Sequence, residues 1–89
     1  MDSVLEPDEA EIVRIMSNLP EFSWLNGAEP AKIRHEISTK VANALREYYF
    51  ENTRGTDTGW TRKFRHAGIT EDDGKAAISC ARRLGMNIS

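Results

Sequence analysis

The chain has 89 residues, a length suited to one small domain with a single hydrophobic core. Hydrophobic residues make up 39% and charged residues 29% of it, which is typical of folded globular proteins and unlike disordered ones. The net charge of −2 argues against a surface that is basic throughout, as expected of a general nucleic-acid binder. We therefore expect one folded domain over residues 1–89.

Cysteine content and hydropathy limit the setting of the protein. Cys80 is the only cysteine, which excludes an internal disulfide and a multi-cysteine zinc site. The acidic start lacks the features of a secretory signal, and no apolar run approaches the roughly 20 residues that span a bilayer. We expect a cytoplasmic protein without a cofactor and without a membrane partner.

Apolar residues at helical spacing predict a first helix over residues 7–19. Pro7 suits the first turn, and Asp8 and Glu9 stabilise the positive end of a helix. The apolar stripe is Ile12, Ile15, Met16 and Leu19, and Pro20 ends the pattern. In the connector that follows, we expect Trp24 to fill part of the core, and the alternative is an exposed aromatic anchor for a partner.

The strongest pattern predicts one long amphipathic helix, opened by Pro30 and regular over residues 31–50. Its apolar positions occupy an arc of about 120° at about 100° per residue: Ile33, Ile37, Val41, Ala44, Leu45 and Tyr48. Arg34 falls inside this arc, and we expect its long stem to carry the charge to solvent. Tyr49 and Phe50 leave aromatic surface that a loop or a partner could cover. A loop is predicted over residues 51–59.

Basic and aromatic residues alternate in the next segment, where a short helix over residues 58–67 is predicted to end at Gly68. In one interpretation, Trp60 and Phe64 face the core and the basic side chains face solvent. In the other, a basic face that includes Arg54 binds nucleic acid through phosphates and stacked bases. The two are compatible if the aromatic side is core and the basic side binds.

The last helix is predicted over residues 70–84, because Thr70 and the acidic residues after it form a strong helix start. Its narrow stripe consists of mostly small residues, Ala77, Cys80, Ala81 and Leu84, and Cys80 is expected to pack there without reacting. Together the elements predict an all-α fold, a small bundle of three to four helices around the long central helix.

Charge is distributed unevenly along the chain. Residues 1–30 carry seven acidic groups and one basic group, a net −6, while residues 31–68 carry eight basic and four acidic groups, a net +4. This distribution favours oriented docking onto a charged partner or self-association. Alternatively, the acidic and basic helices neutralise one another within the bundle.

No pattern indicates catalysis or metal binding. His35 and His66 fall opposite the apolar stripes, and the carboxylates cluster at helix starts. We therefore expect a non-catalytic protein-interaction module, a regulator, inhibitor or adaptor, whose partner is another protein. The alternative is a nucleic-acid-binding protein that uses residues 54–66. The candidate partner-binding residues are Tyr49, Phe50, Arg54, Trp60, Arg62, Lys63, Arg65 and His66.

Overall fold

The computed structural model describes residues 4–55 and 59–88, and within these ranges it is helical. The α-helices are α1 (Pro7–Met16), α2 (Pro30–Glu36), α3 (Ala42–Arg54), α4 (Trp60–His66) and α5 (Glu71–Arg83). A 3₁₀ segment, η1 (Pro20–Leu25), lies between α1 and α2, and a π-helical segment, η2 (Ile37–Val41), joins α2 to α3. The described residues contain no strand, and the predicted all-α fold is confirmed.

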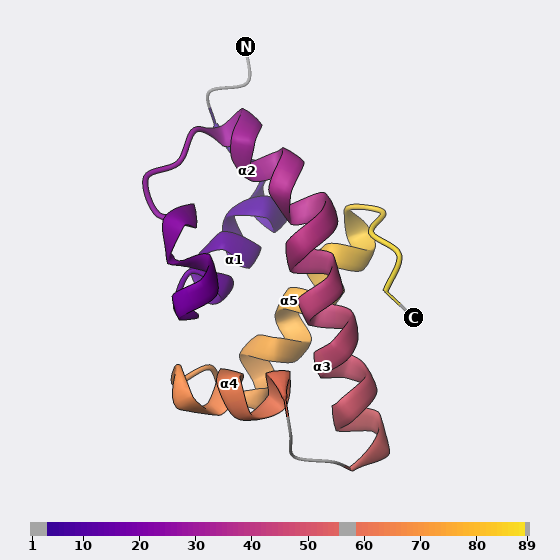
Figure 1. The fold of residues 1–89 in the computed structure, drawn as a ribbon. Coiled ribbons are helices and arrows are strands. Elements are labelled where there is room, and N and C mark those ends of the chain that lie inside the picture. The colour runs from indigo at the N-terminus through magenta and orange to yellow at the C-terminus, as the bar shows by residue number, and fades with distance from the viewer. Residues whose placement is uncertain (1–3, 56–58, 89) are drawn as a thin grey trace.

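The helices form two layers across the core (Figure 1). Segments α2, η2 and α3 make one continuous rod over residues 30–54, which is about 37 Å long at about 1.5 Å per residue. Helices α1 and α5 pack against each other behind this rod, and α5 also contacts α3. Helix α4 lies across one end of the molecule, where it packs against α3. The rod therefore spans most of the longest dimension, 43 Å.

The predicted apolar stripes form the core. Its buried members include Ile12, Ile15, Met16, Ile33, Ile37, Val41, Leu45, Tyr48, Phe64, Ala77, Cys80 and Ala81. Leu19 is fully buried although α1 ends at Met16, because a turn carries its side chain back to the core. Trp24 is half-buried and packs at the edge of this cluster, so it fills less of the core than expected.

Helix α3 is one turn longer than predicted. The expected loop is wrong for residues 51–54, because α3 continues to Arg54 and ends at Gly55, whose φ of 74° is the left-handed conformation that closes many helices. This turn extends past the core, so it needs no apolar stripe, and the periodicity that marks a helix is lost there. Residues 56–58 of the predicted loop and helix lie outside the described residues.

The other helix boundaries are close to their predictions. Helix α4 is described from Trp60, and Gly68 follows its end with a φ of 78°. Helix α5 begins after Thr70, whose hydroxyl oxygen accepts the amide of Asp73 at 3.1 Å, as the start signal predicted.

A buried ion pair joins α1 to α2. The Glu9 side chain accepts from the Arg34 Nε at 3.0 and 3.1 Å through its two oxygens, and Glu9 is only 7% exposed. Glu9 also accepts a hydrogen bond from the backbone amide of Glu6 at 2.8 Å, which caps the N-terminus of α1. Arg34 Nη2 donates to the Val4 carbonyl at 2.6 Å. The Arg34 guanidinium thus pairs with a buried carboxylate, and its side chain is 28% exposed, so the charge is only partly solvated where solvent alone was expected to receive it.

We expect Arg34→Met to lower the free energy of unfolding by about 3 kcal/mol, because it leaves the Glu9 carboxylate buried without its cation. Urea denaturation followed by circular dichroism measures this loss. The control is Lys40→Met, which removes the pair between the exposed Lys40 and the half-buried Glu36 and should change stability by no more than about 0.5 kcal/mol. Equal losses in the two variants would show that the Arg34–Glu9 pair contributes no more to stability than the Lys40–Glu36 pair.

The contact between α5 and Tyr48 requires glycine at position 74. A Cβ on Gly74 would lie 2.7 Å from the Tyr48 hydroxyl oxygen and 2.8 Å from two ring carbons. The Tyr48 ring has little room to move, because it is 3% exposed and stacks on Phe64 with centroids 4.5 Å apart.

Gly74→Ala should therefore destabilise the protein by about 1–3 kcal/mol through overpacking. In an unconstrained helix the same change stabilises by about 1 kcal/mol, so the sign of the effect is diagnostic. Thermal unfolding measures it, with Ser79→Ala on the exposed side of α5 as a control that should be neutral or slightly stabilising. A Gly74→Ala protein as stable as the parent would show that Tyr48 does not press on α5.

Candidate binding surfaces

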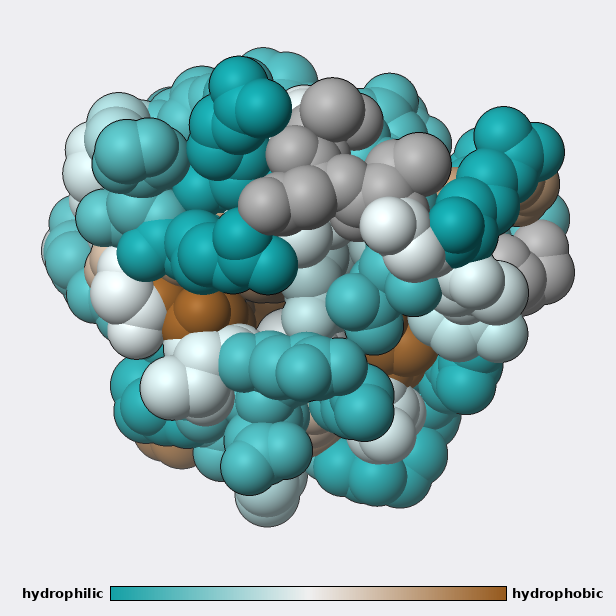
Figure 2. Space-filling model, turned by 90° about the horizontal axis from the view of Figure 1, so that it is seen from below, coloured by the Kyte–Doolittle hydropathy of each residue, from teal (hydrophilic) through white to brown (hydrophobic). Residues whose placement is uncertain are grey.

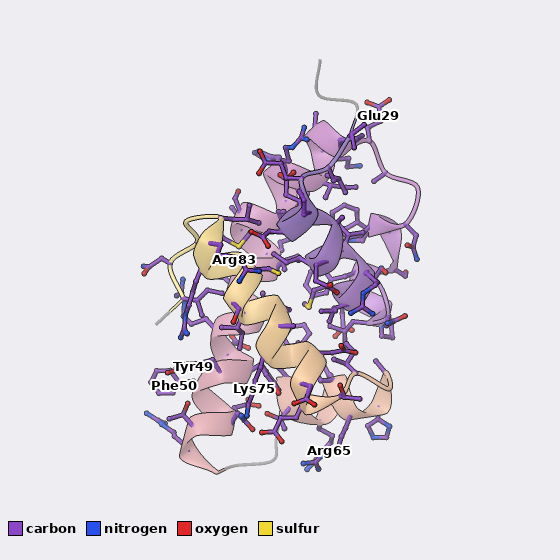
Figure 3. The ribbon with its side chains drawn as sticks, turned by 180° about the vertical axis from the view of Figure 1, so that it is seen from behind. Glu29, Tyr49, Phe50, Arg65, Lys75 and Arg83 are labelled. Atoms are coloured by element: carbon purple, nitrogen blue, oxygen red, sulfur yellow. The ribbon has the colours of Figure 1, made fainter. Side chains whose placement is uncertain are left out.

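The candidate binding residues lie on two separate surfaces. Tyr49, Phe50 and Arg54 belong to the end of α3, and the others belong to α4. Figure 3 shows Tyr49 and Phe50 projecting from α3 on one side of the molecule, while Arg65 lies apart from them on α4. A segment that is continuous in sequence is thus divided between two faces.

The aromatic side chains of α4 are used in the core. Phe64 is 2% exposed and stacks on Tyr48. Trp60 is half-buried, stacks on Phe22 with centroids 5.9 Å apart, and meets Phe64 edge-on at 6.5 Å. These rings form a continuous ladder from η1 through α4 to α3, held by the favourable geometry of aromatic pairs. The interpretation in which Trp60 and Phe64 face inward agrees with this arrangement.

The basic side chains of α4 are exposed, and Lys63 is engaged within the molecule. Its Nζ lies 4.3 Å from the centroid of the Trp60 ring and 2.5 Å from Glu21 Oε2. The Lys63–Glu21 pair links the basic part of the sequence to the acidic part, as Arg34–Glu9 also does. Some of the charge asymmetry is therefore neutralised inside the bundle.

Helix α4 is positioned by the last turns of α3. The Glu51 side chain accepts the backbone amide of Thr61 at 3.1 Å, which satisfies a donor in the first turn of α4. Gly59 precedes this turn with φ 55° and ψ −122°, a conformation open to glycine, and a Cβ there would collide with the Glu51 carboxylate. The extra turn of α3 thus holds α4 in place.

A broad open groove of about 590 Å³ runs beside α4, and its lining residues are Asn18, Pro20, Glu21, Gly59, Arg62, Lys63, His66 and Ala67. Figure 2 views the end of the molecule where α4 lies. Hydrophilic side chains cover most of this end, and hydrophobic residues come to the surface only in small recessed spots between them. The described side chains visible in this view therefore form no broad apolar contact area.

Another groove, of about 380 Å³, lies between α3 and α5. Its lining residues are Tyr48, Tyr49, Asn52, Thr53, Lys75, Ile78, Ser79 and Arg82. Arg82 sits with its guanidinium carbon 5.0 Å from the Tyr49 ring centroid, and Lys75 forms an exposed pair with Glu71 at 3.4 Å. Figure 3 shows Lys75 on the same side of the molecule as Tyr49.

Phe50 follows the groove-lining Tyr49 on α3 and is 48% exposed, with the guanidinium carbon of Arg54 4.3 Å from its ring centroid. We define the α3–α5 face as Arg46, Tyr49, Phe50 and Arg54 of α3 with Lys75 and Arg82 of α5. Sequence reasoning missed its α5 members. Their seven-residue spacing places them on one side of α5, but only the packing of α5 against α3 brings them beside Tyr49.

The remaining groups of chemical interest are Cys80 and the side chains of the types that bind metal ions. Cys80 is buried, and burial, aided by a hydrogen bond to Asp8, raises the pKa of its thiol, which disfavours the reactive thiolate. Across residues 4–55 and 59–88, no three His, Cys, Asp or Glu side chains gather closely enough to hold a metal ion. Over the same ranges, no helix is long and apolar enough to cross a membrane.

Comparison with known proteins adds no relative. No protein-family model, no curated protein and no solved structure matches the chain.

Acid should weaken the contacts made by two carboxylates. A hydrogen bond from Arg83 holds the pKa of Asp8 below its ordinary value, and a hydrogen bond from Lys63 does the same for the pKa of Glu21. A carboxyl group whose pKa is lowered by folding stabilises the protein above its unfolded pKa of about 4. That contribution is lost as the pH falls through the lower, folded pKa.

We therefore expect the free energy of unfolding to fall as the pH drops below about 5. Lys63→Gln and Arg83→Gln should each flatten this decline, because each removes the cation that lowers one carboxyl pKa. Urea midpoints across the acidic range test this, with Lys40→Gln as a control whose charge lies elsewhere. If both variants kept the parent's pH dependence, these pairs would not be its source.

Proposed function

We propose that the chain is a small non-catalytic binding module, of the regulator, inhibitor or adaptor kind, and that a partner protein docks on the α3–α5 face. The observation that carries this proposal is the exposure of Phe50. Every other aromatic side chain in the described residues is buried or half-buried. Exposed aromatic side chains are typical anchors of protein interfaces, where a few residues supply most of the binding energy.

The surroundings of Phe50 support an anchoring role. Arg46 and Arg54 lie one helical turn before and after it, and Arg54 stacks on its ring. Arginine and aromatic residues are both enriched among the energetically important residues of interfaces. The groove lined by the preceding residue, Tyr49, supplies a concave surface into which a partner side chain could insert.

A protein partner is favoured over the alternative, a nucleic-acid role for residues 54–66. Binding of single strands combines cations with exposed rings on which bases stack. On α4, Phe64 is buried and Trp60 is covered in part by Phe22, Phe64 and Lys63. The rings that a nucleic-acid role would use therefore already serve the core.

We expect Phe50→Ala to weaken binding of the partner protein by about thirtyfold, the effect of losing roughly 2 kcal/mol at an anchor residue. Affinity capture with nuclease treatment, from cells that make the protein, would identify candidates. Calorimetry with a purified partner then gives the Kd for parent and variant. Circular dichroism confirms that each variant is folded.

The matched control is Val4→Ala, since Val4 is 76% exposed and is the other large hydrophobic residue left open in the described chain. It lies beside the α2 end of the rod, through the contact of its carbonyl with Arg34. Equal affinity of the parent and Phe50→Ala proteins would overturn the assignment of this face. Capture of nucleic acid instead of protein, lost on Arg62→Glu, would favour the alternative function.

A further inference from the structure

We infer that the groove between α3 and α5 binds an acidic peptide segment of the partner, and that Lys75 and Arg82 select it. This inference rests on the proposed function, because the groove-lining residues Tyr49, Lys75 and Arg82 belong to the same α3–α5 face as Phe50. It adds the chemistry of the partner: aspartate or glutamate side chains interspersed with apolar ones.

The two cations are placed to act together on one ligand. Lys75 and Arg82 are two turns apart on α5, which separates them by about 10.5 Å along the helix. Both line the groove, together with the polar side chains of Asn52, Thr53 and Ser79. A segment that crosses the groove could therefore place one carboxylate near each cation.

Arg82 is held in position without an ion pair to any carboxylate of residues 4–55 and 59–88. Its guanidinium lies over the Tyr49 ring, and its Nε donates to the Ile88 carbonyl at 3.4 Å. Within the described ranges, no carboxylate forms an ion pair with Arg82. A preorganised guanidinium can accept a carboxylate with little loss of side-chain freedom, which is a major cost of binding.

Lys75 can exchange its ion pair with Glu71 for one with a carboxylate of the ligand. Its ion pair with Glu71 joins side chains that are 64% and 63% exposed, and such pairs contribute little to stability. An incoming carboxylate can therefore replace Glu71 at small cost.

The groove favours a peptide over a bare anion or a second copy of the chain. Tyr48 and Ile78, which are 3% and 5% exposed, line its inner part and suit apolar side chains between the acidic ones. The same face of a second copy would bring like charges together and be repelled. Helix α1 of a second copy is acidic, but it is a poor ligand for the groove as well. Its Asp8 and Glu9 are already paired with Arg83 and Arg34 of their own chain.

The test uses a fluorescein-labelled peptide of alternating glutamate and leucine, with binding to the full chain measured by fluorescence anisotropy. We expect saturable binding that weakens as salt is raised to about 0.15 M, where charges are screened beyond about 8 Å. A counterpart with glutamine in place of glutamate should bind more weakly.

Lys75→Gln and Arg82→Gln should each raise the Kd about two- to fivefold, the range expected for loss of one exposed ion pair. Lys40→Gln is the matched control. Lys40 is 66% exposed and pairs with Glu36 at 3.3 Å in the same i,i+4 arrangement as Lys75 with Glu71. Its loss changes the net charge equally but leaves the groove intact, so the Kd should not change.

Because Arg82 also contacts the chain end, Arg82→Lys separates charge from structure and should keep most of the affinity. The inference is overturned if the acidic peptide does not bind or the glutamine peptide binds equally well. It is also overturned if Lys40→Gln weakens binding as much as Lys75→Gln, or if an oligothymidylate competes as well as the acidic peptide. If, in those cases, Phe50→Ala still weakens binding of a natural partner protein, the proposed function is retained and only the acidic-peptide inference fails.

Discussion

The packing of Tyr48 determines which way the end of the long helix faces. Its ring stacks on Phe64 and presses against Gly74, so this residue must point into the core. Successive residues of an α-helix are turned by about 100°, and the next positions follow from that. Tyr49 lines the groove, Phe50 faces solvent, and Glu51 reaches the first turn of α4. One contact in the core thus positions the exposed side chain on which the proposed function depends.

The charges are arranged so that much of their asymmetry is satisfied internally. Glu9 with Arg34, Glu21 with Lys63, and Asp8 with Arg83 join acidic residues near the start of the chain to basic residues that come later. The pairs connect α1 to α2, η1 to α4, and α1 to α5. The arginines of the α3–α5 face are arranged differently, since Arg54 and Arg82 contact aromatic rings. A stacked guanidinium keeps its charge, which makes this face suited to an acidic partner.

The sequence predicted the elements that repeat a local pattern. The apolar stripe of the long helix and the Thr70 start signal both recur in the structure, because periodicity and capping depend on residues close in sequence. It did not predict the inward turn of Arg34, whose partner is 25 positions away. It also missed η2, where the Ser38 and Thr39 hydroxyls donate to the His35 and Glu36 carbonyls at 2.7 and 3.2 Å. Such hydroxyls can bend or distort a helix without changing its apolar pattern.

The sequence identified the aromatic end of α3 as a candidate binding surface, but it grouped these residues with those of α4. The fold separates the two and brings Lys75 and Arg82 to Tyr49 instead. The periodicity of one helix predicts which of its sides is apolar. It does not predict which other helix lies beside its polar side. Docking between helices depends on long-range packing, such as the approach of Gly74 to Tyr48, and that has no local signature.

An NMR titration would determine whether ligands bind on the α3–α5 face. The ¹⁵N-labelled chain would be titrated with the alternating glutamate and leucine peptide while its backbone amide shifts are followed. For binding on this face, we expect little change at Arg62 and His66 and the largest changes on the amides of Tyr49, Phe50, Thr53, Lys75, Ser79 and Arg82. Changes confined to α4, or spread evenly over the chain, would contradict it.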